Sequence, residues 1–236
     1  MQKSRRILLI TGTSSGLGKD LSKYFIKKNY IVLGCSRSKS KISSKFYKHR
    51  ILNLNDETEV TKWVKDIHFK YKKIDYLINN AALIPASFPS ILNDKELVTR
   101  VFETNVISQI NVINEVAKKM VKKNFGRIIN LSSMSVGLLE EGTSLYSSLK
   151  NSLDTYSKIL SKELAKANIT CNTIAPSMYN TKSFRELGET IINNSKKKLQ
   201  VQRELKLEEI ANVIEFLFKN ESAVITGQTI YLGLTN

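Results

Sequence analysis

The chain has 236 residues, of which 42% are hydrophobic and 25% charged, and its formal net charge is +16. No apolar run approaches the roughly 18 residues of a membrane span, and the run at 7–10 is shorter than the roughly 7–15 residues of a secretory signal. These features predict one cytoplasmic globular domain. Because the lysines are scattered, without a basic tail or a nucleic-acid-binding motif, we expect attraction of anionic cofactors and substrates rather than nucleic acid.

The cysteines and histidines predict neither a disulfide framework nor a metal site. Cys35 and Cys171 lie far apart inside apolar stretches, as buried free thiols do. His49 and His68 have no Cys or His partner at metal-ligand spacing, so neither is assigned a role.

Short apolar runs alternate along the chain with longer amphipathic segments. The predicted strands are 6–12, 31–36, 50–55, 74–82, 127–133, 169–176 and 229–233, and the predicted helices are 18–29, 56–73, 94–124, 144–168 and 206–220. This alternation predicts an α/β fold: a single Rossmann-type, doubly wound parallel sheet of about seven strands with helices on both faces. Without a linker or repeat, residues 1–236 are expected to form a single domain.

Three glycines, Gly12, Gly16 and Gly18, fall where the first strand becomes the first helix. Glycines allow a tight turn there and let a phosphate approach the N–H groups and dipole at the helix N-terminus. A plain glycine-rich turn is the alternative.

The second strand is followed by cations. Residues 31–46 contain no Asp or Glu, although an acid about 20 residues after the glycines commonly binds the adenosine 2′-hydroxyl of NAD. Arg37 stands at the strand end and is followed by Lys39, Lys41 and Lys45. We therefore expect a 2′-phosphate at Arg37, whereas the three lysines also fit solvated loop charges.

Two tyrosine–lysine pairs have helical spacing, Tyr146 with Lys150 and Tyr24 with Lys28. A spacing of four residues places both side chains on one helix face, where the ammonium charge favours the phenolate. The second pair lies on the helix after the glycine turn. Tyr146 follows the fifth strand, and Ser133 lies at the carboxyl end of that strand, where ligands bind in open α/β sheets. The Tyr146 pair is therefore the candidate for chemistry.

In this order and spacing, the motifs resemble those of the classical short-chain dehydrogenase/reductase family over nearly the whole chain. The matching motifs are T-G-x-x-x-G-x-G at 11–18, N-N-A at 79–81, Asn105, Ser133 at 13 residues before Tyr146, Y-x-x-x-K at 146–150, Pro176 to Thr181, and the last strand. Four positions depart from the family pattern: Asn53, Ala82, Ser177 and Leu234.

The resemblance implies an NADPH-dependent reductase that transfers a hydride between the nicotinamide and a carbonyl or secondary alcohol. Tyr146 would be the general acid/base, Ser133 would hydrogen-bond the carbonyl oxygen, Lys150 would lower the tyrosine pKa and hold the ribose hydroxyls, and Asn105 would hold a relay water. The implied NADP(H)-binding residues are Gly12, Ser14, Ser15, Gly16, Leu17, Gly18, Ser36, Arg37, Asn53, Leu54, Asn79, Ala81, Tyr146, Lys150, Pro176 and Thr181.

Segments 83–92 and 177–200 are expected to border the substrate pocket, since loops carry specificity. The resemblance suggests 3-oxoacyl groups on an acidic carrier protein, and sugars or small ketones also fit. A homo-oligomer, a tetramer or dimer, is expected. The alternatives are an NAD-dependent alcohol or sugar dehydrogenase and a non-catalytic dinucleotide-binding protein.

Overall fold

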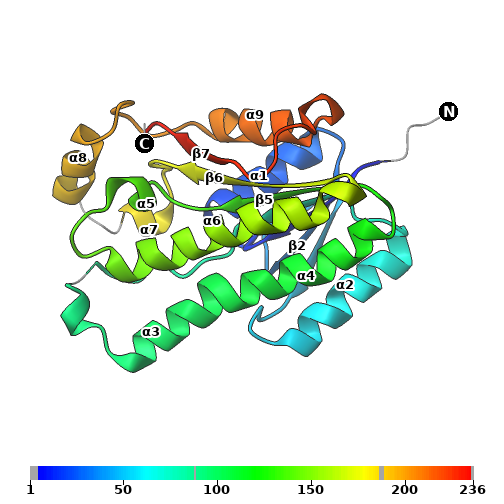
Figure 1. Ribbon diagram of the computed structural model, residues 1–236, viewed down its shortest axis with the longest axis horizontal. Coiled ribbons are helices and arrows are strands. Elements are labelled where there is room, and N and C mark those ends of the chain that lie inside the picture. The colour runs from blue at the N-terminus through cyan, green and yellow to red at the C-terminus, as the bar shows by residue number, and fades with distance from the viewer. Residues whose placement is uncertain (1–4, 88, 186–188, 235–236) are drawn as a thin grey trace.

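The computed structural model describes residues 5–87, 89–185 and 189–234, which contain a seven-stranded parallel sheet of order β3-β2-β1-β4-β5-β6-β7 (Figure 1). The strands are β1 (Ile7–Thr11), β2 (Ile31–Ser36), β3 (Tyr47–Ile51), β4 (Tyr76–Asn79), β5 (Gly126–Leu131), β6 (Ile169–Pro176) and β7 (Thr229–Leu232). The helices are α1 (Gly16–Lys27), α2 (Glu57–Tyr71), α3 (Lys95–Phe102), α4 (Ser108–Val121), α5 (Ser135–Leu138), α6 (Ser144–Leu164), α7 (Lys182–Arg185), α8 (Glu189–Lys197) and α9 (Leu207–Phe218). Short 3₁₀ turns occupy η1 (Ser90–Leu92), η3 (Ala165–Ala167) and η4 (Asn220–Ser222), and a π-helical turn occupies η2 (Glu103–Ile107).

The alternation of side chains along the strands builds two hydrophobic cores, one on each face of the sheet. On β1, Ile7 and Leu9 join the core covered by α2, α4 and α6, whereas Leu8 and Ile10 join the core covered by α1 and α9. Figure 1 shows these two helical layers on opposite sides of the sheet. The predicted doubly wound α/β sheet is therefore confirmed.

The third strand differs from its prediction. It was expected at 50–55, but β3 spans Tyr47–Ile51 and pairs with β2 from Val32 to Ser36. The alternation of buried and exposed residues extends beyond β3, since Leu52 and Leu54 are both buried. However, β2 ends at Ser36, whose carbonyl accepts the last bond from the Leu52 N–H at 2.9 Å. The chain then has no strand to pair with and turns into α2.

The helix predicted from 94 through 124 is continuous and consists of α3, η2 and α4. The π-helical turn η2 connects α3 directly to α4, and it carries the buried Asn105. Such turns are rare and frequently occur at functional sites. Segment 177–200, expected as a loop, contains the short helices α7 and α8.

The structure also confirms that Cys35 and Cys171 are buried free thiols. Among the helices of the described residues, none combines the length and hydropathy needed to cross a membrane.

Candidate active site

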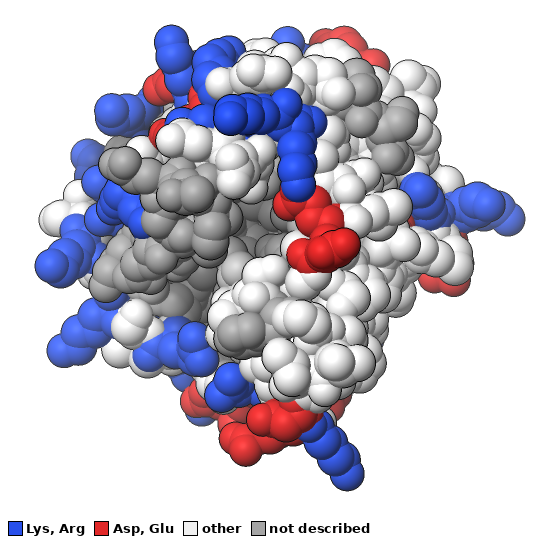
Figure 2. Space-filling view, turned by 90° about the vertical axis from the view of Figure 1, so that its left-hand side faces the viewer, with Lys and Arg blue, Asp and Glu red and all other residues white. Residues whose placement is uncertain are grey.

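The site lies at the carboxyl ends of the central strands. β1 sits between β2 and β4, so the chain connections diverge there and leave the crevice at which ligands bind in such sheets. Figure 2 looks onto this edge, which is hollowed near its centre, with Asp or Glu side chains beside the hollow and Lys and Arg side chains along the top and left of the view.

The glycine turn has the geometry of a phosphate cradle. Gly12 and Gly16 adopt left-handed φ angles of 75° and 55°, which glycine reaches at little cost. A Cβ on Gly12 would lie 2.8 Å from the Asn80 amide nitrogen. No Ser15 side-chain hydrogen bond caps the start of α1, so the first N–H groups of the helix, from Gly16 to Gly18, can serve an anion. Ser14, Ser15 and Leu17 complete this turn.

Asn80 holds the turn from behind, although it was not among the predicted cofactor contacts. Its side chain donates to the Thr11 carbonyl at 2.9 Å, and its N–H donates to the Thr11 hydroxyl at 2.9 Å. The predicted residue Asn79 is fully buried and donates to the Gln109 carbonyl at 3.2 Å. The Ala81 N–H donates to the Thr11 hydroxyl at 3.0 Å. The Thr11 hydroxyl donates to Asn79 Oδ1 at 3.3 Å, so Asn79 supports the turn from the interior.

The segment after β6 reaches back to the same turn. A Cβ on Gly16 would lie 3.3 Å from the Thr181 methyl group, which places Thr181 directly against the cradle. The Thr181 hydroxyl accepts from the Phe184 N–H at 3.1 Å. At the end of β6, the Pro176 carbonyl accepts from the Met134 N–H at 3.1 Å, next to Ser133.

The predicted adenosine end contains an exposed arginine. Arg37 follows β2 directly, and no hydrogen bond or ion pair joins it to another described residue. Ser36 is partly buried, and its hydroxyl donates to the Ser38 carbonyl at 2.8 Å. Asn53 is exposed and Leu54 is buried in the turn before α2.

His49, which the sequence left without a role, lies at this end of the site. Its Nε2 is 2.9 Å from the Ser38 carbonyl and 3.3 Å from the Ser36 hydroxyl, so it holds the backbone on both sides of Arg37. Its Nδ1 is 2.9 Å from the Tyr47 hydroxyl, which donates to Thr13 in the glycine turn at 2.8 Å. The predicted strand at 50–55 excluded His49, whose position depends on the observed register that pairs it with Gly34.

Ser133, Tyr146 and Lys150 come together beyond β5. Tyr146 is half-buried in the first turn of α6, and burial raises its pKa to about 12, while a hydrogen bond with Ser133 acts in the opposite direction. Lys150 is 2% exposed, and its ammonium lies 5.9 Å from the Tyr146 ring centroid and donates to the Leu131 carbonyl at 2.7 Å. Burial lowers the pKa of Lys150 to about 8.

These values differ from the expectation that Lys150 lowers the phenol pKa below its usual range. Loss of hydration destabilises the Tyr146 phenolate by more than the neighbouring groups stabilise it. The effect of burial on the pKa is therefore the larger one. The phenol consequently stays protonated at neutral pH, as a proton donor must.

Asn105 is fully buried, and both polar atoms of its side-chain amide form hydrogen bonds with the backbone of Leu83. The Leu83 N–H donates to Oδ1 at 2.7 Å, and Nδ2 donates to the Leu83 carbonyl at 2.8 Å. The structure thus brings Asn105 to the first residue of segment 83–92, and its water relay stays a prediction.

The second tyrosine–lysine pair, Tyr24 and Lys28, forms a contact between helices. The Tyr24 hydroxyl donates to Glu215 at 2.7 Å, and Lys28 forms an ion pair with the same carboxylate at 3.4 Å. This pair therefore links α1 to α9. It is a surface contact between two helices, which agrees with the choice of Tyr146.

Of the two predicted substrate segments, the structure describes residues 83–87, 89–92, 177–185 and 189–200, and their place at a substrate pocket stays a prediction. An ion pair of 2.6 Å joins Lys198, just after α8, to Glu140, in the loop before α6. Within the described ranges, no group of three or more His, Cys, Asp or Glu side chains is arranged to hold a metal ion.

Comparison with known proteins agrees with this architecture. The family model described as enoyl-(acyl carrier protein) reductase matches residues 12–233. The chain is 31% identical to the 3-oxoacyl-[acyl-carrier-protein] reductase FabG of Buchnera aphidicola subsp. Schizaphis graminum, over 99% of this chain and 98% of that protein. This chain therefore belongs to the short-chain dehydrogenase/reductase family of oxidoreductases.

Two solved structures illustrate the likeness. ElxO with NADP bound has a TM-score of 0.89 at 25% identity, with 96% of each chain covered. The 3-ketoacyl-(acyl-carrier-protein) reductase from Brucella melitensis, complexed with NADH, has a TM-score of 0.87 at 23% identity, again with 96% of each chain covered. At that identity, the second comparison concerns the fold alone.

Proposed function

We propose that this protein is an NADP(H)-dependent carbonyl reductase with Tyr146 as its general acid. The observation that carries the proposal is the meeting of the Tyr146 and Ser133 hydroxyl groups at the carboxyl edge of the sheet, with Lys150 buried one helical turn away. A chain that only bound a dinucleotide would have no need to bury a lysine ammonium, which costs free energy.

The residues divide the reaction among them. NADPH, when bound, supplies the hydride to the carbonyl carbon. Ser133 donates a hydrogen bond to the carbonyl oxygen as negative charge develops there. Tyr146 gives its proton to that oxygen. Burial raises the pKa of Tyr146 to about 12, so the phenol is protonated at neutral pH and can give this proton.

The cofactor preference rests on Arg37. Its guanidinium is exposed beside the cradle, no carboxylate stands between residues 31 and 46, and His49 holds the loop around it. A guanidinium can grip a 2′-phosphate through paired, charge-assisted hydrogen bonds. The relative ElxO is described with NADP and the Brucella reductase with NADH, so the fold accommodates either dinucleotide. Residues near the adenosine end must therefore determine the cofactor preference.

For the substrate, we propose a 3-oxoacyl group on an acidic carrier protein. The Lys and Arg side chains that gather along the top and left of this face would attract an acidic partner (Figure 2). Ile84, Ile91 and Leu92 of segment 83–92 are exposed at 60%, 92% and 67%, and they offer an apolar surface to an acyl chain. The relative from Buchnera carries the name of that activity. Sugars and small ketones are the alternatives.

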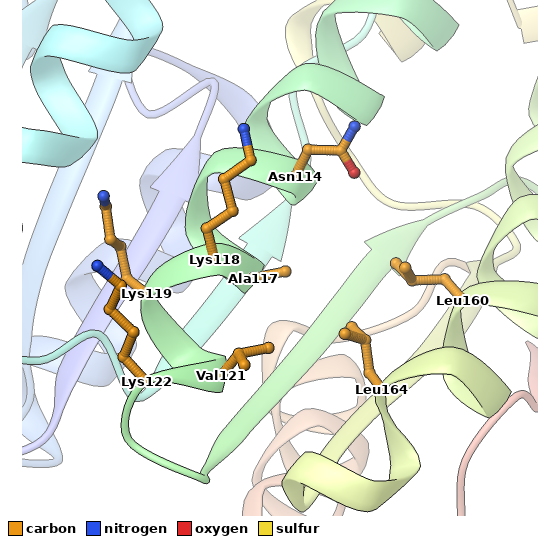
Figure 3. Close-up of a pocket in the computed structure, with 8 residues that line it drawn as sticks. All are labelled: Asn114, Ala117, Lys118, Lys119, Val121, Lys122, Leu160 and Leu164. Carbon is orange, nitrogen blue, oxygen red and sulfur yellow. The ribbon is translucent and has the colours of Figure 1, made fainter.

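We further propose that the chain forms a homo-oligomer through α4 and α6. Figure 3 shows a groove between them in which Ala117 and Val121 point toward Leu160 and Leu164. Ile159 on α6 is 54% exposed. Ala117 and Leu160 are already buried, so a second copy would chiefly remove Val121 and Ile159 from water. Light scattering at micromolar concentration should show a dimer or tetramer, and a monomer would contradict this proposal.

The deciding experiment for the activity is a steady-state assay of the purified protein over a panel of carbonyl compounds with NADPH and with NADH. The panel holds acetoacetyl thioesters, free and on an acyl carrier protein, together with sugars and small ketones. We expect the highest kcat/KM with NADPH and a carrier-bound 3-oxoacyl thioester. Faster oxidation of an alcohol with NAD would overturn the proposal.

A further inference from the structure

A buried carboxylate lies one helical turn beyond Lys150 on α6. Asp154 is 2% exposed. Its Oδ2 accepts from the Ser132 hydroxyl at 3.2 Å, and its Oδ1 has no hydrogen-bond partner. A buried carboxylate with half of its hydrogen-bonding capacity unused costs stability, because it loses its hydration. The reaction described above does not use this group.

The groups that face Asp154 come from three elements. Lys150 and Lys158 lie one turn before and one turn after it on α6, Ser132 follows β5, and Tyr231 approaches from β7. Lys158 is exposed, whereas Lys150 is buried. Because charges in a low-dielectric interior interact more strongly than charges at the surface, Asp154 acts mainly on Lys150.

The buried charge of Lys150 has little other stabilisation. Its ammonium has one neutral hydrogen-bond acceptor, the Leu131 carbonyl at 2.7 Å, and is otherwise removed from water. A carbonyl dipole alone is weak compensation for a buried charge. Asp154 is the carboxylate that supplies the opposite charge to this lysine.

We propose that Asp154 is a positioning residue that acts through Lys150, in that its buried negative charge keeps the Lys150 ammonium charged at neutral pH. The inference deepens the proposed function and rests on the role that Lys150 has there. Burial lowers the pKa of Lys150 to about 8, and the Asp154 charge opposes that effect. Burial raises the pKa of Asp154 to about 6, and Ser132 and Lys150 oppose that effect. Between these two values, both groups are charged.

The test measures the lysine directly, by NMR titration of protein labelled with ¹³C at the lysine Cε. In the wild type, one resonance should titrate near pH 8, apart from the exposed lysines at about 10.4, and it should be missing from Lys150→Arg. Asp154→Asn and Asp154→Leu both remove the charge, and each should move this titration down by about one pH unit. Lys158→Gln is the matched control, because it removes a neighbouring charge on the same helix and should not lower the titration.

The same displacement should appear in kcat/KM, whose fall at high pH should begin about one pH unit lower in the two Asp154 variants. A Lys150 titration that stays at the wild-type pH in whichever Asp154 variants fold would overturn the inference. The NMR result does not depend on turnover. If no carbonyl compound is reduced, the proposed function fails, whereas a displaced titration still supports the coupling of Asp154 to Lys150.

Discussion

Asn105 binds the backbone of Leu83 at both of its polar atoms, with distances of 2.7 Å and 2.8 Å. The π-helical turn η2 is thereby tied to the first residue of segment 83–92. An asparagine suits this contact because its amide pairs one acceptor with one donor, as a backbone residue does.

We expect Asn105→Ala to raise the KM for the carbonyl substrate and to lower stability by about 1–3 kcal/mol, because the Leu83 N–H and carbonyl lose their partners. Thermal unfolding and steady-state kinetics measure both effects. Asn111→Ala, on the partly exposed face of α4, is the control and should change neither. Equal effects in the two variants would show that the Leu83 contact has no special role.

Removal of the proton donor should affect turnover alone. Tyr146→Phe should reduce kcat by about 10²–10⁴-fold while NADPH still binds, because only the hydroxyl is lost. Binding is measured by the quenching of protein fluorescence. Tyr24→Phe should keep full activity, since that hydroxyl bonds only to Glu215 among the described residues. A Tyr146→Phe enzyme with wild-type turnover would refute the assignment of the acid.

Arg37→Asp should lose or reverse the preference for NADPH. One charge-assisted hydrogen bond is worth about 1.5–3 kcal/mol, and even the lower figure gives roughly a tenfold change in kcat/KM. The preference is the ratio of kcat/KM with NADPH to that with NADH. Lys41→Asp changes the same charge in the exposed part of the loop and should have a smaller effect, because solvent and salt screen it. A wild type that prefers NADH would contradict this prediction.

His49→Leu should weaken the preference for NADPH without altering the charge at Arg37. The variant loses the contacts of Nε2 with the Ser38 carbonyl and the Ser36 hydroxyl, so the loop around Arg37 is held less firmly. We expect a rise of a few-fold in the KM for NADPH and little change for NADH. His68→Leu on α2 is the control. A similar change in KM for both cofactors would point to a general loss of structure.

The stability of the protein should depend on Asp154 in acid. Burial raises the pKa of Asp154 from 3.8 to about 6, so between these values the native state binds more protons than the unfolded chain. Its contribution to stability is present below pH 3.8 and is lost as the pH rises through about 6. Relative to the wild type, Asp154→Asn should gain up to about 3 kcal/mol of unfolding free energy across this window. Urea unfolding at several pH values measures the difference, and a gap that is constant with pH would contradict it.

The sequence by itself determined the fold class and where Ser133, Tyr146 and Lys150 lie in it. The alternation of strands and helices follows from local hydrophobic periodicity, and the glycine turn follows from residues 12–18. The spacing of Ser133, Tyr146 and Lys150 places them at the end of one strand and on the next long helix, and the structure has them there. These features depend on neighbours along the chain, which is why the sequence contains them.

Only the tertiary structure decided which other groups act on these residues. The register of β2 and β3 brings His49 to Ser36 and Ser38, on either side of Arg37. Asp154 faces Lys150 and Ser132 inside the core. The direction of the Tyr146 pKa was also expected wrongly, because the sequence shows the lysine four residues away but not the burial of the phenol. Desolvation depends on every atom that packs around a group, and most of those atoms come from distant parts of the chain.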